Sequence, residues 1–495
     1  MTERLPKGWC LAPFERLTEN HDGRRVPVKA SERAQRQGLY PYYGASGIID
    51  QVDEYLFDGD YLLIAEDGAN LLSRSTPIAF QAHGKFWVNN HAHVTKPLFD
   101  APLGYLEAFL NSIDLARYIT GTAQPKLTQK ALNRIDVPLP PLNEQRRIVA
   151  KLDSLQERSR RARESLDAVP ALLDKLRQSI LAAAFRGDLT RDFREQHKDL
   201  EPASKLLQRI RTERRKKWEE AELAKLKAKG KAPTDDKWKA KYKEPDPVDP
   251  TGLPTLPDGW CWASADELSN DITVGHVGPM EHRYVSDGVP FLRSQNVRAN
   301  RYDPTGLRYI PLDFHAELSK SRLSPGDLVV VRSGAPGTAC VIPDELTNAN
   351  CADLVIARLI SLVDPHVIAF YMNSAWGTGA VLDAQVGVAQ QHFNVGAMRA
   401  LHMPLMPMSE QCVLRERLTE ALLAIAKHER RLSGLSTELD TLDRAILAKA
   451  FRGELVPQDP RDEPADELLA RVRADQAAPS TPRGRKRAAE AALHD

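Results

Sequence analysis

The sequence ILAAAFRGDL at residues 180–189 recurs almost unchanged as ILAKAFRGEL at residues 446–455. Eight of the ten letters agree, and the offset between the copies is 266 residues. At this offset residues 121–189 align with residues 387–455 without a gap, with 22 identities in 69 positions. The period is far longer than that of a solenoid repeat. The chain is therefore predicted to be a two-fold duplication of one unit, a variable domain followed by a helix.

Outside the helix end, the identities between the two halves gather in short motifs. The aligned pairs are GTAQ with GVAQ (starting at 121 and 387) and PLPPLNEQ with PLMPMSEQ (starting at 138 and 404). At slightly different offsets, LPKGWC resembles LPDGWC (starting at 5 and 256), and EPASKLLQRIR resembles EPADELLARVR (starting at 201 and 463). The middle of each half shows little agreement, so the duplication is expected to preserve the helices while the domains diverge.

Apolar side chains in each repeated helix recur in alternating steps of four and three residues. The seam residues are Ile148, Leu152, Leu166, Leu173, Leu176 and Ile180 in the first copy, and Leu414, Leu418, Leu432, Leu439, Leu442 and Ile446 in the second. This 3.5-residue period, kept over about 40 residues, predicts a coiled-coil seam of roughly 60 Å. We expect the two helices to pair with each other in antiparallel orientation. The alternative is that each helix packs only on its own domain.

The ends of both helices have residues suited to a start and a stop. Asn143 and Ser409 each follow a proline and are expected to cap the first turn, and an acidic residue that suits the helix dipole comes next. Gly187 and Gly453 follow the last turn, where glycine commonly ends a helix. Pro170 lies inside the first helix and is expected to kink it.

The rest of the chain divides around these helices. The two variable domains mix short apolar strands with Gly-, Asn- and Pro-rich turns, which predicts an α+β fold for each. The predicted segments are variable domain 1 (1–142), the first coiled-coil helix (143–189), a basic helical segment with a proline-rich linker (190–250), variable domain 2 (251–408), the second coiled-coil helix (409–456) and a charged, disordered tail (457–495).

Polar side chains suited to the edges of nucleic-acid bases lie in predicted turns of both domains. Arginine suits guanine, and asparagine or glutamine suits adenine, in the major groove of DNA. An ordinary solvated loop or a capping asparagine is the alternative interpretation for each position. The candidate DNA-binding residues are Tyr42, Tyr43, Asn70, Arg74, Asn89 and His91 in the first domain, and Arg293, Gln295, Asn296, Arg298 and Arg332 in the second.

The charge of the two domains does not favour simple binding to phosphates. Residues 1–142 contain 15 Lys and Arg against 16 Asp and Glu, and residues 251–408 contain 10 against 15. Non-specific affinity for duplex DNA comes mainly from neutralised phosphates. The basic segment at 201–243, with 15 Lys and Arg against 7 Asp and Glu, is either an arm on phosphates or a helix that docks on a partner.

Several functional classes are disfavoured by the sequence. The chain has no GxxxxGK[ST] phosphate loop, no HExxH or GxSxG motif, and no [DN]-P-P-[FYW] tetrapeptide of adenine methyltransferases. Its five cysteines are scattered without a CxxC pair, which argues against a zinc site and favours a reduced, cytoplasmic setting. No stretch approaches the length of a membrane span. We therefore expect no catalytic, cofactor-binding or metal-binding residues in this chain, and no membrane association.

The combination of motifs resembles the specificity (S) subunit of type I restriction-modification enzymes. The resemblance rests on GTAQPKLTQKALNRIDVPLPPLNEQRRIVAKLD, on the AAFRGDL helix end, on the repetition of both, and on the LPDGW entries to the domains. Each motif alone is weak, but the combination is specific and spans nearly the whole chain. The stretch GVAQQHFNVGAM departs from the more usual AQP-type sequence, and His428 lies on the seam, so local packing there is in doubt.

The resemblance implies a division of labour. The variable domains would be two target recognition domains, separated by two long antiparallel coiled-coil helices and related by a pseudo-two-fold axis. Each would read one half of a bipartite, asymmetric site on double-stranded DNA. Two methyltransferase (M) subunits would bring S-adenosylmethionine and methylate adenine at N6. Two restriction (R) subunits would use ATP and Mg to move along and cut DNA. This chain would itself hold no cofactor and perform no catalysis.

Two other hypotheses remain open at this point. The chain could be a stand-alone DNA methyltransferase or endonuclease, although it lacks the donor and phosphate motifs that such an enzyme needs. It could also be a coiled-coil scaffold that never contacts DNA. A protected bipartite site on DNA would separate the specificity subunit from the scaffold.

Overall fold

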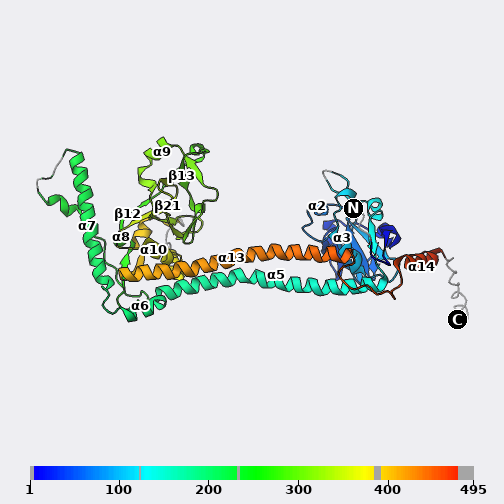
Figure 1. The fold of residues 1–495 in the computed structure, drawn as a ribbon. Helices are drawn as coiled ribbons and strands as arrows, with labels where there is room; N and C mark the ends of the chain where they lie inside the picture. The colour runs from blue at the N-terminus through cyan, green and yellow to red at the C-terminus, as the bar shows by residue number, and fades with distance from the viewer. Residues whose placement is uncertain (1–4, 122–123, 231–232, 234, 384–391, 478–495) are drawn as a thin grey trace, which may run out of the picture. The chain divides into compact units, whose positions relative to one another are not determined.

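The computed structural model describes the chain except residues 1–4, 122–123, 231–232, 234, 384–391 and 478–495. Its internal contacts divide the chain into two units, each of which is compact. Unit 1 comprises Met1–Asp167 with Leu432–Asp495, and unit 2 comprises Ala168–Arg431. Each unit therefore combines one variable domain with part of both long helices (Figure 1). The GVAQ motif and two residues of GTAQ lie outside the described residues.

Variable domain 1 contains two four-stranded sheets and a short ladder. The first sheet has the order β2 (Thr18–Asn20), β9 (Ala92–Pro97), β6 (Tyr61–Ala65), β7 (Ala79–Ala82). The second has the order β4 (Gly47–Val52), β3 (Tyr40–Gly44), β8 (Lys85–Val88), β5 (Phe57–Asp58). The ladder pairs β1 (Cys10–Pro13) with β10 (Asp136–Leu139), which leads into the first long helix. Helix α3 (Leu103–Ser112) follows β9, and α4 (Gln129–Asn133) precedes β10.

Variable domain 2 repeats this topology strand for strand. Its first sheet has the order β12 (Ser269–Val274), β21 (Leu354–Leu359), β18 (Leu328–Val331), β19 (Ala339–Val341). Its second has the order β16 (Arg308–Ile310), β13 (Val289–Leu292), β20 (Ala349–Cys351), β17 (Arg322–Leu323). The ladder pairs β11 (Cys261–Ser264) with β22 (His402–Leu405), and α10 (Pro365–Met372) and α12 (Val395–Ala400) correspond to α3 and α4.

The direction of strand pairing also agrees between the domains. In each second sheet one pair is parallel, β3 with β8 and β13 with β20, whereas the other pairs are antiparallel. A short hairpin of β14 (Val297–Arg298) and β15 (Arg301–Tyr302) is an addition in domain 2. The predicted α+β duplication is therefore confirmed, and it extends into the part of each half where the sequences have diverged.

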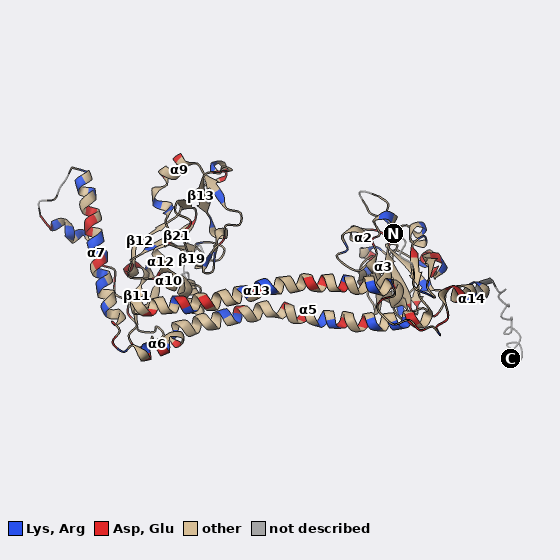
Figure 2. Ribbon diagram, in the orientation of Figure 1, with Lys and Arg blue, Asp and Glu red and all other residues tan. Residues whose placement is uncertain are grey.

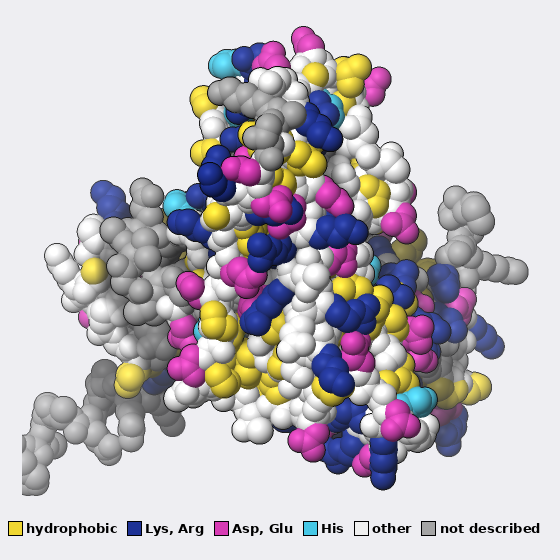
Figure 3. Space-filling model, turned by 90° about the vertical axis from the view of Figure 1, so that its left-hand side faces the viewer, with side chains coloured by type: hydrophobic (Ala, Val, Ile, Leu, Met, Phe, Trp, Pro, Cys, Tyr) yellow, Lys and Arg dark blue, Asp and Glu magenta, His cyan; other side chains and the backbone are white. Residues whose placement is uncertain are grey.

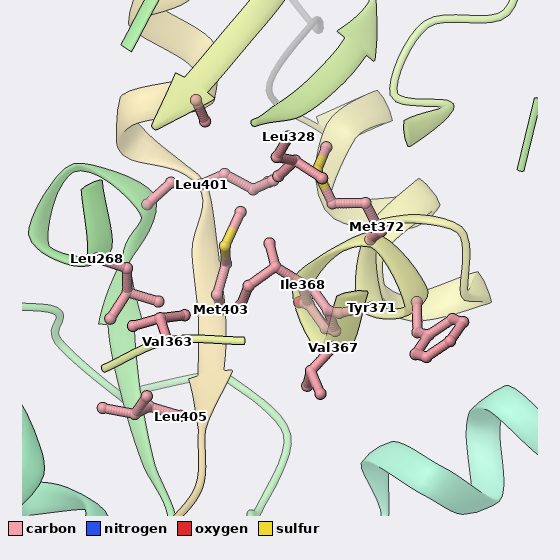
Figure 4. Packing of buried hydrophobic residues seen from close by; sticks show 14 of the residues in the cluster. Leu268, Leu328, Val363, Val367, Ile368, Tyr371, Met372, Leu401, Met403 and Leu405 are labelled. Carbon is pink, nitrogen blue, oxygen red and sulfur yellow. The ribbon is translucent and has the colours of Figure 1, made fainter. Parts of the chain in front are cut away.

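The core of unit 2 shows how a variable domain attaches to the long helices. Leu328, Ile368 and Met403 lie among the buried apolar side chains that β18, α10 and β22 contribute to one cluster (Figure 4). The same cluster includes Phe185 from the first long helix and Leu418 from the second. Burying apolar surface at about 25 cal/mol per Å² is the main favourable term in such packing. The domain and the helix segments of unit 2 therefore share a single core.

The two repeated helices are α5 (Leu142–Phe185) and α13 (Met408–Phe451), both 44 residues long. Gly187 and Gly453 have φ of 77° and 74°, so the predicted glycine stops are confirmed. The predicted caps are wrong, because Asn143 and Ser409 lie inside the first turn rather than before it. Helix α5 continues through Pro170.

Each unit brings α5 and α13 together in antiparallel orientation (Figure 1). In unit 1, Ser159 donates to Asp443 at 3.0 Å, and Arg163 pairs with Asp440 at 2.7 Å, so the partner's number falls as the first rises. In unit 2, Arg177 of α5 pairs with Glu429 of α13 at 2.7 Å. The antiparallel pairing expected from the 3.5-residue period is therefore confirmed within each unit.

Burial along the predicted seam is uneven. Seam residues near the domains are buried, those farther along the helices are half-buried, and two are exposed. The buried ones are Ile148, Leu152, Leu173, Leu414 and Leu418; the half-buried ones are Leu166, Ile180, Leu432, Leu439 and Ile446. The prediction is wrong for Leu176 and Leu442, whose exposed fractions are 47% and 52%. These two residues occupy equivalent positions, because their numbers differ by the repeat offset of 266.

The repeated sequence motifs meet at one joint in each unit. In unit 1, the indole of Trp9, from LPKGWC, donates to Glu144, from PLNEQ, at 3.2 Å. The equivalent bond in unit 2 joins Trp260 to Glu410 at 2.9 Å. A Cβ on Gly453 would collide with Pro6. The motifs recur together because the tryptophan, the acid and the glycine pack against one another.

The same joint exists in unit 2 with one addition. A Cβ on Gly187 would collide with Pro257, as expected for the equivalent of Gly453. The second carboxylate oxygen of Glu410 accepts hydrogen bonds from Thr190, at 2.6 Å, and from Arg194. Among the described residues the corresponding oxygen of Glu144 is buried without a partner. Burial is the largest cause that raises the pKa of Glu144.

The segments that follow the long helices pack as helices on the domains. After α6 (Arg191–Gln196), α7 (Ala203–Ala228) begins with its amide at Ala203 bonded to the carbonyl of Gly259 at 2.8 Å. In unit 1 the amide of Ala465 bonds to the carbonyl of Gly8 at 2.9 Å, at the start of α14 (Ala465–Ala477). The prediction of a disordered tail is therefore wrong for 465–477, where burial of Ala465, Leu468, Leu469 and Val472 holds the helix in place.

Candidate nucleic-acid interface

Two of the predicted DNA-binding residues are core residues. Tyr42 is 1% exposed, and its hydroxyl accepts from the amide of Val28 at 2.9 Å. Asn296 is fully buried, and its amide group donates to the carbonyls of Asp303 and Thr305 at 2.9 and 3.2 Å. Because releasing a buried polar group from its partners costs about 1–3 kcal/mol, neither side chain is available to a base edge. The expectation of base contact is wrong for both.

Four further candidates maintain the local fold of their loops. Tyr43 packs its ring against Phe80 and Phe86. Asn70 bonds to the backbone of Thr76 in both directions at 3.0 Å. Arg74 donates to the carbonyls of Leu110 and Ile113, which closes the end of α3. Asn89 is 6% exposed and accepts from the amide of His91 at 2.8 Å.

The remaining five candidates reach the surface. Gln295 and Arg293 donate to the carbonyl of Gly306 at 3.1 and 2.9 Å, and Arg298 lies 3.4 Å from Asp303 with 55% of its side chain exposed. His91 is 48% exposed, whereas Arg332 is 18% exposed. Of the eleven candidates, only these five present polar atoms to a ligand without disturbing the core.

His91 belongs to a polar contact between two loops of domain 1. The segment that follows β6 contains Asp67, and the turn between β8 and β9 contains His91. The carboxylate of Asp67 lies 2.9 Å from Nδ1 of His91. The amide of Glu66 also donates to the carbonyl of His91 at 2.9 Å. We call the meeting of these two loops the polar junction of domain 1.

Arg332 belongs to the corresponding junction of domain 2. The segment that follows β18 contains Arg332 and Ser333, and the turn between β20 and β21 contains Asp353. Arg332 and Ser333 donate to the carboxylate of Asp353 at 2.7 and 3.2 Å. The hydroxyl of Ser333 lies 2.8 Å from Nδ1 of His392. Asp353 has φ of 53°, a left-handed conformation that costs an L residue energy and is often kept at functional sites.

The two junctions occupy the same place in the fold but differ in chemistry. β6 is equivalent to β18, and the turn between β8 and β9 is equivalent to that between β20 and β21. Domain 1 presents an acid and an imidazole, Asp67 and His91, where domain 2 presents Arg332, Ser333 and Asp353. Asp67, Ser333, Asp353 and His392 were missed by sequence analysis, because they are distant in sequence from the partners that they contact.

An ionic cluster supports the junction of domain 1 from below. Oxygens of Asp22 and Glu66 and a ring nitrogen of His93 lie within 4.8 Å of one another, a spacing that a metal ion requires. Arg25 and Lys126 instead pair with Glu66 at 2.7 and 3.1 Å. Burial acts to raise the pKa of Asp22, but the hydrogen bond from His93 outweighs it, and the net pKa is lowered. These five groups satisfy one another by ion pairing.

None of the helices in the described part of the chain combines the length and apolar composition that a bilayer span requires.

Comparison with known proteins adds a family to this geometry. Residues 17–167 match the family model described as type I restriction modification DNA specificity domain. A putative type I restriction enzyme specificity subunit of Haemophilus influenzae is 37% identical over 143 residues, which are 29% of this chain and 36% of that protein. The EcoDI specificity subunit of Escherichia coli is 23% identical over 486 residues, which are 96% of this chain and 97% of that one.

Solved structures share the fold across most of the chain. A chain from work on the complex assembly and conformational transition of the type I R-M system has a TM-score of 0.61 at 18% identity, over 92% of this chain and all of that one. The HsdS subunit from Thermoanaerobacter tengcongensis has a TM-score of 0.53 at 18% identity, over 92% and 99%. Together with the duplicated helices, the equivalent joints and the sequence matches, these likenesses show that the chain belongs to the type I restriction enzyme specificity subunits.

Proposed function

We propose that the chain selects the DNA sequence on which a type I restriction-modification complex acts. Each variable domain reads one half of a bipartite, asymmetric site, and the chain itself is not catalytic. The observation that supports this most strongly is the contrast between the two units. Their joints repeat the same contacts, Trp9 with Glu144 and Trp260 with Glu410, whereas their polar junctions differ in every side chain.

The repeated helices support binding of two copies of one partner. Leu176 and Leu442 are exposed at equivalent positions, and an exposed leucine at a predicted seam position is suited to cover by another protein. Because equivalent surfaces bind equivalent partners, two methyltransferase subunits are proposed to dock on the helices. S-adenosylmethionine, ATP and Mg belong to the methyltransferase and motor-nuclease subunits in this proposal. The complex acts on double-stranded DNA in the cytoplasm.

The test is reconstitution with the methyltransferase encoded beside this chain. The purified complex should contain two methyltransferase chains for each copy of this protein. It should protect two short DNA segments separated by an unprotected spacer in a footprinting experiment. A single continuous footprint, or a complex that protects no particular sequence, would contradict the proposal. Adenine methylation by this chain in isolation would contradict its non-catalytic role.

A further inference from the structure

The distal part of α7 and the short helix after it form a basic projection on unit 2. We call residues 211–243 the arm; it comprises the outer turns of α7 and the 3-10 helix η5 (Lys237–Lys241). The arm contains 13 Lys and Arg against 6 Asp and Glu, a net charge of +7. The whole chain has a net charge of only +1, so the rest of the chain is net negative. Figure 2 shows blue bands recurring along α7.

The first turns of α7 fix the arm to variable domain 2. Leu206, Leu207 and Ile210 are buried in the core that contains β18 and β22. Arg211 donates to the fully buried carboxylate of Glu267, at 2.5 Å for the nearer nitrogen. Arg214 bonds to the carbonyl of Ser269 at 3.1 Å. The arm therefore projects from a rigid base, and its direction is set by the domain.

Aromatic packing holds the outer end of the arm in one conformation. The ring of Trp218 lies 6.3 Å from that of Trp238 and 5.3 Å from that of Tyr242, between ring centres. The hydroxyl of Tyr242 accepts from Arg214 at 3.0 Å. Because these contacts return η5 to the side of α7, the positive charges of both segments are held in place before any ligand arrives. Such preorganisation lowers the entropy cost of binding.

A subset of the lysines on the arm is left without a carboxylate. Lys217, Lys225 and Lys239 pair with acidic residues of the arm itself at 3.0, 3.8 and 3.0 Å. Five exposed lysines form no ion pair with any residue in the described part of the chain: Lys216, Lys227, Lys229, Lys241 and Lys243. Lys216 and Lys227 are three helical turns apart and so lie on one face of α7. Figure 3 shows basic side chains exposed on the side of unit 2 that faces the viewer, interspersed with acidic ones.

The need for such charges arises from the recognition domains. Variable domain 2 contains 10 Lys and Arg against 15 Asp and Glu over residues 251–408. A DNA reader requires neutralised phosphates for most of its affinity. Base contacts supply sequence preference, and phosphate contacts supply position and strength. A rigid, positively charged projection attached to an acidic reading domain provides this missing contribution.

We infer that the arm binds the phosphate backbone of duplex DNA beside the half-site read by domain 2. This inference rests on the proposed function, because it assumes that domain 2 contacts DNA. The arm contributes affinity that is independent of sequence and sensitive to salt, and it contributes nothing to the choice of bases. The five unpaired lysines are the groups that displace cations from the phosphates.

The test compares two variants of the full chain, each in complex with its methyltransferase. The first changes all five unpaired lysines to glutamine, from Lys216→Gln to Lys243→Gln. The second changes the same five positions to arginine, which keeps the charge and serves as the matched control. Binding to a duplex with the complete site and long flanks is measured over a range of salt concentrations. A duplex that ends at the half-site of domain 2 is measured in parallel.

The glutamine variant should bind the long duplex more weakly, and the slope of log affinity against log salt should become shallower by about 4 if all five lysines contact phosphates. The arginine variant should keep the wild-type slope. The shortened duplex should bind wild type and the glutamine variant equally, and the methylated motif should not change. An unchanged slope in the glutamine variant would overturn the inference. Loss of a protein subunit from that variant's complex, with an unchanged slope, would identify the arm as a protein-docking surface instead.

These results are separable from failure of the proposed function. If the wild-type complex methylates no bipartite motif, the proposed function itself is wrong. If the motif is methylated normally and the salt slope of the glutamine variant is unchanged, only the arm's role is wrong.

Discussion

Glu410→Gln should destabilise unit 2 by about 3 kcal/mol, whereas the equivalent Glu144→Gln should change the stability of unit 1 by less than about 1 kcal/mol. Glu410 is fully buried and accepts hydrogen bonds from Trp260, Thr190 and Arg194. Its replacement leaves the guanidinium of Arg194 without a charge partner. Glu144 is equally buried but bonds to Trp9 alone. Its second oxygen has no partner among the described residues, so the neutral amide loses little.

The pH dependence of the two variants should differ for the same reason. Burial raises the pKa of Glu144 above its value in the unfolded chain. Its contribution is therefore most favourable below the unfolded pKa and is lost as the pH rises through the folded pKa. Glu144→Gln should gain stability relative to wild type as the pH rises from 4 to about 7. Hydrogen exchange of peptides from β1 and β11 reports the two units separately.

The matched pair makes this prediction specific. If Glu144→Gln opens the β1 ladder as much as Glu410→Gln opens the β11 ladder, the extra partners of Glu410 have no energetic role. If neither variant changes exchange at its own joint, the buried tryptophan–glutamate contacts do not hold the domains to the helices. Both results would contradict the description of the joints.

Leu418→Asp should prevent stable folding of unit 2, whereas Leu442→Asp should leave folding unchanged. Leu418 is fully buried in the core that α13 shares with the domain, and Leu→Ala alone costs about 2–5 kcal/mol at such a site. A buried carboxylate adds the cost of removing a charge from water. Leu442 is 52% exposed, although the seam pattern treats the two leucines alike. Thermal unfolding followed by circular dichroism measures both variants.

Equal melting of the two variants would contradict the difference in burial. Leu442→Asp carries a second expectation from the proposed function, because Leu442 is proposed to lie under a methyltransferase subunit. This variant should fold normally and bind fewer methyltransferase chains in size-exclusion chromatography with light scattering. Normal folding with a full complement of methyltransferase chains would remove Leu442 from the docking surface.

The parts of the fold that sequence predicted well are those with a period or a repeat. The offset of 266 residues located two helices of 44 residues and their glycine stops, because helix geometry imposes a period that sequence preserves. The seam pattern was less accurate at Leu176 and Leu442. A heptad position predicts the side of a helix, but burial there depends on how closely the other helix approaches.

The site was harder to predict, because letters do not reveal which way a polar side chain faces. Tyr42 and Asn296 have the chemistry of base readers, yet their polar atoms satisfy the backbone inside the core. Asp67 and Asp353 look like ordinary turn residues until the strand order brings His91 and Arg332 beside them. The equivalence of the two junctions was hidden as well, since it exists in topology and not in sequence.

The helix in the tail had a sequence signal that was outweighed by composition. EPADELLARVR, from residue 463, resembles the segment that opens α7, and both segments begin a helix on a domain. The charged residues that follow were the reason for predicting disorder over 457–495. A short apolar stripe, Leu468, Leu469 and Val472, was sufficient to dock the helix because the domain supplies the other half of the core.

The central proposal is that each variable domain alone specifies one half of the DNA site. The most direct measurement is methylation-sensitive long-read sequencing of cells that express the methyltransferase with one of two chains. One is the wild type, and the other has residues 1–142 replaced by the first domain of another family member. The account predicts a bipartite adenine-methylated motif in which the exchange alters one half and leaves the other half unchanged. A motif that changes in both halves, or in neither, would contradict it.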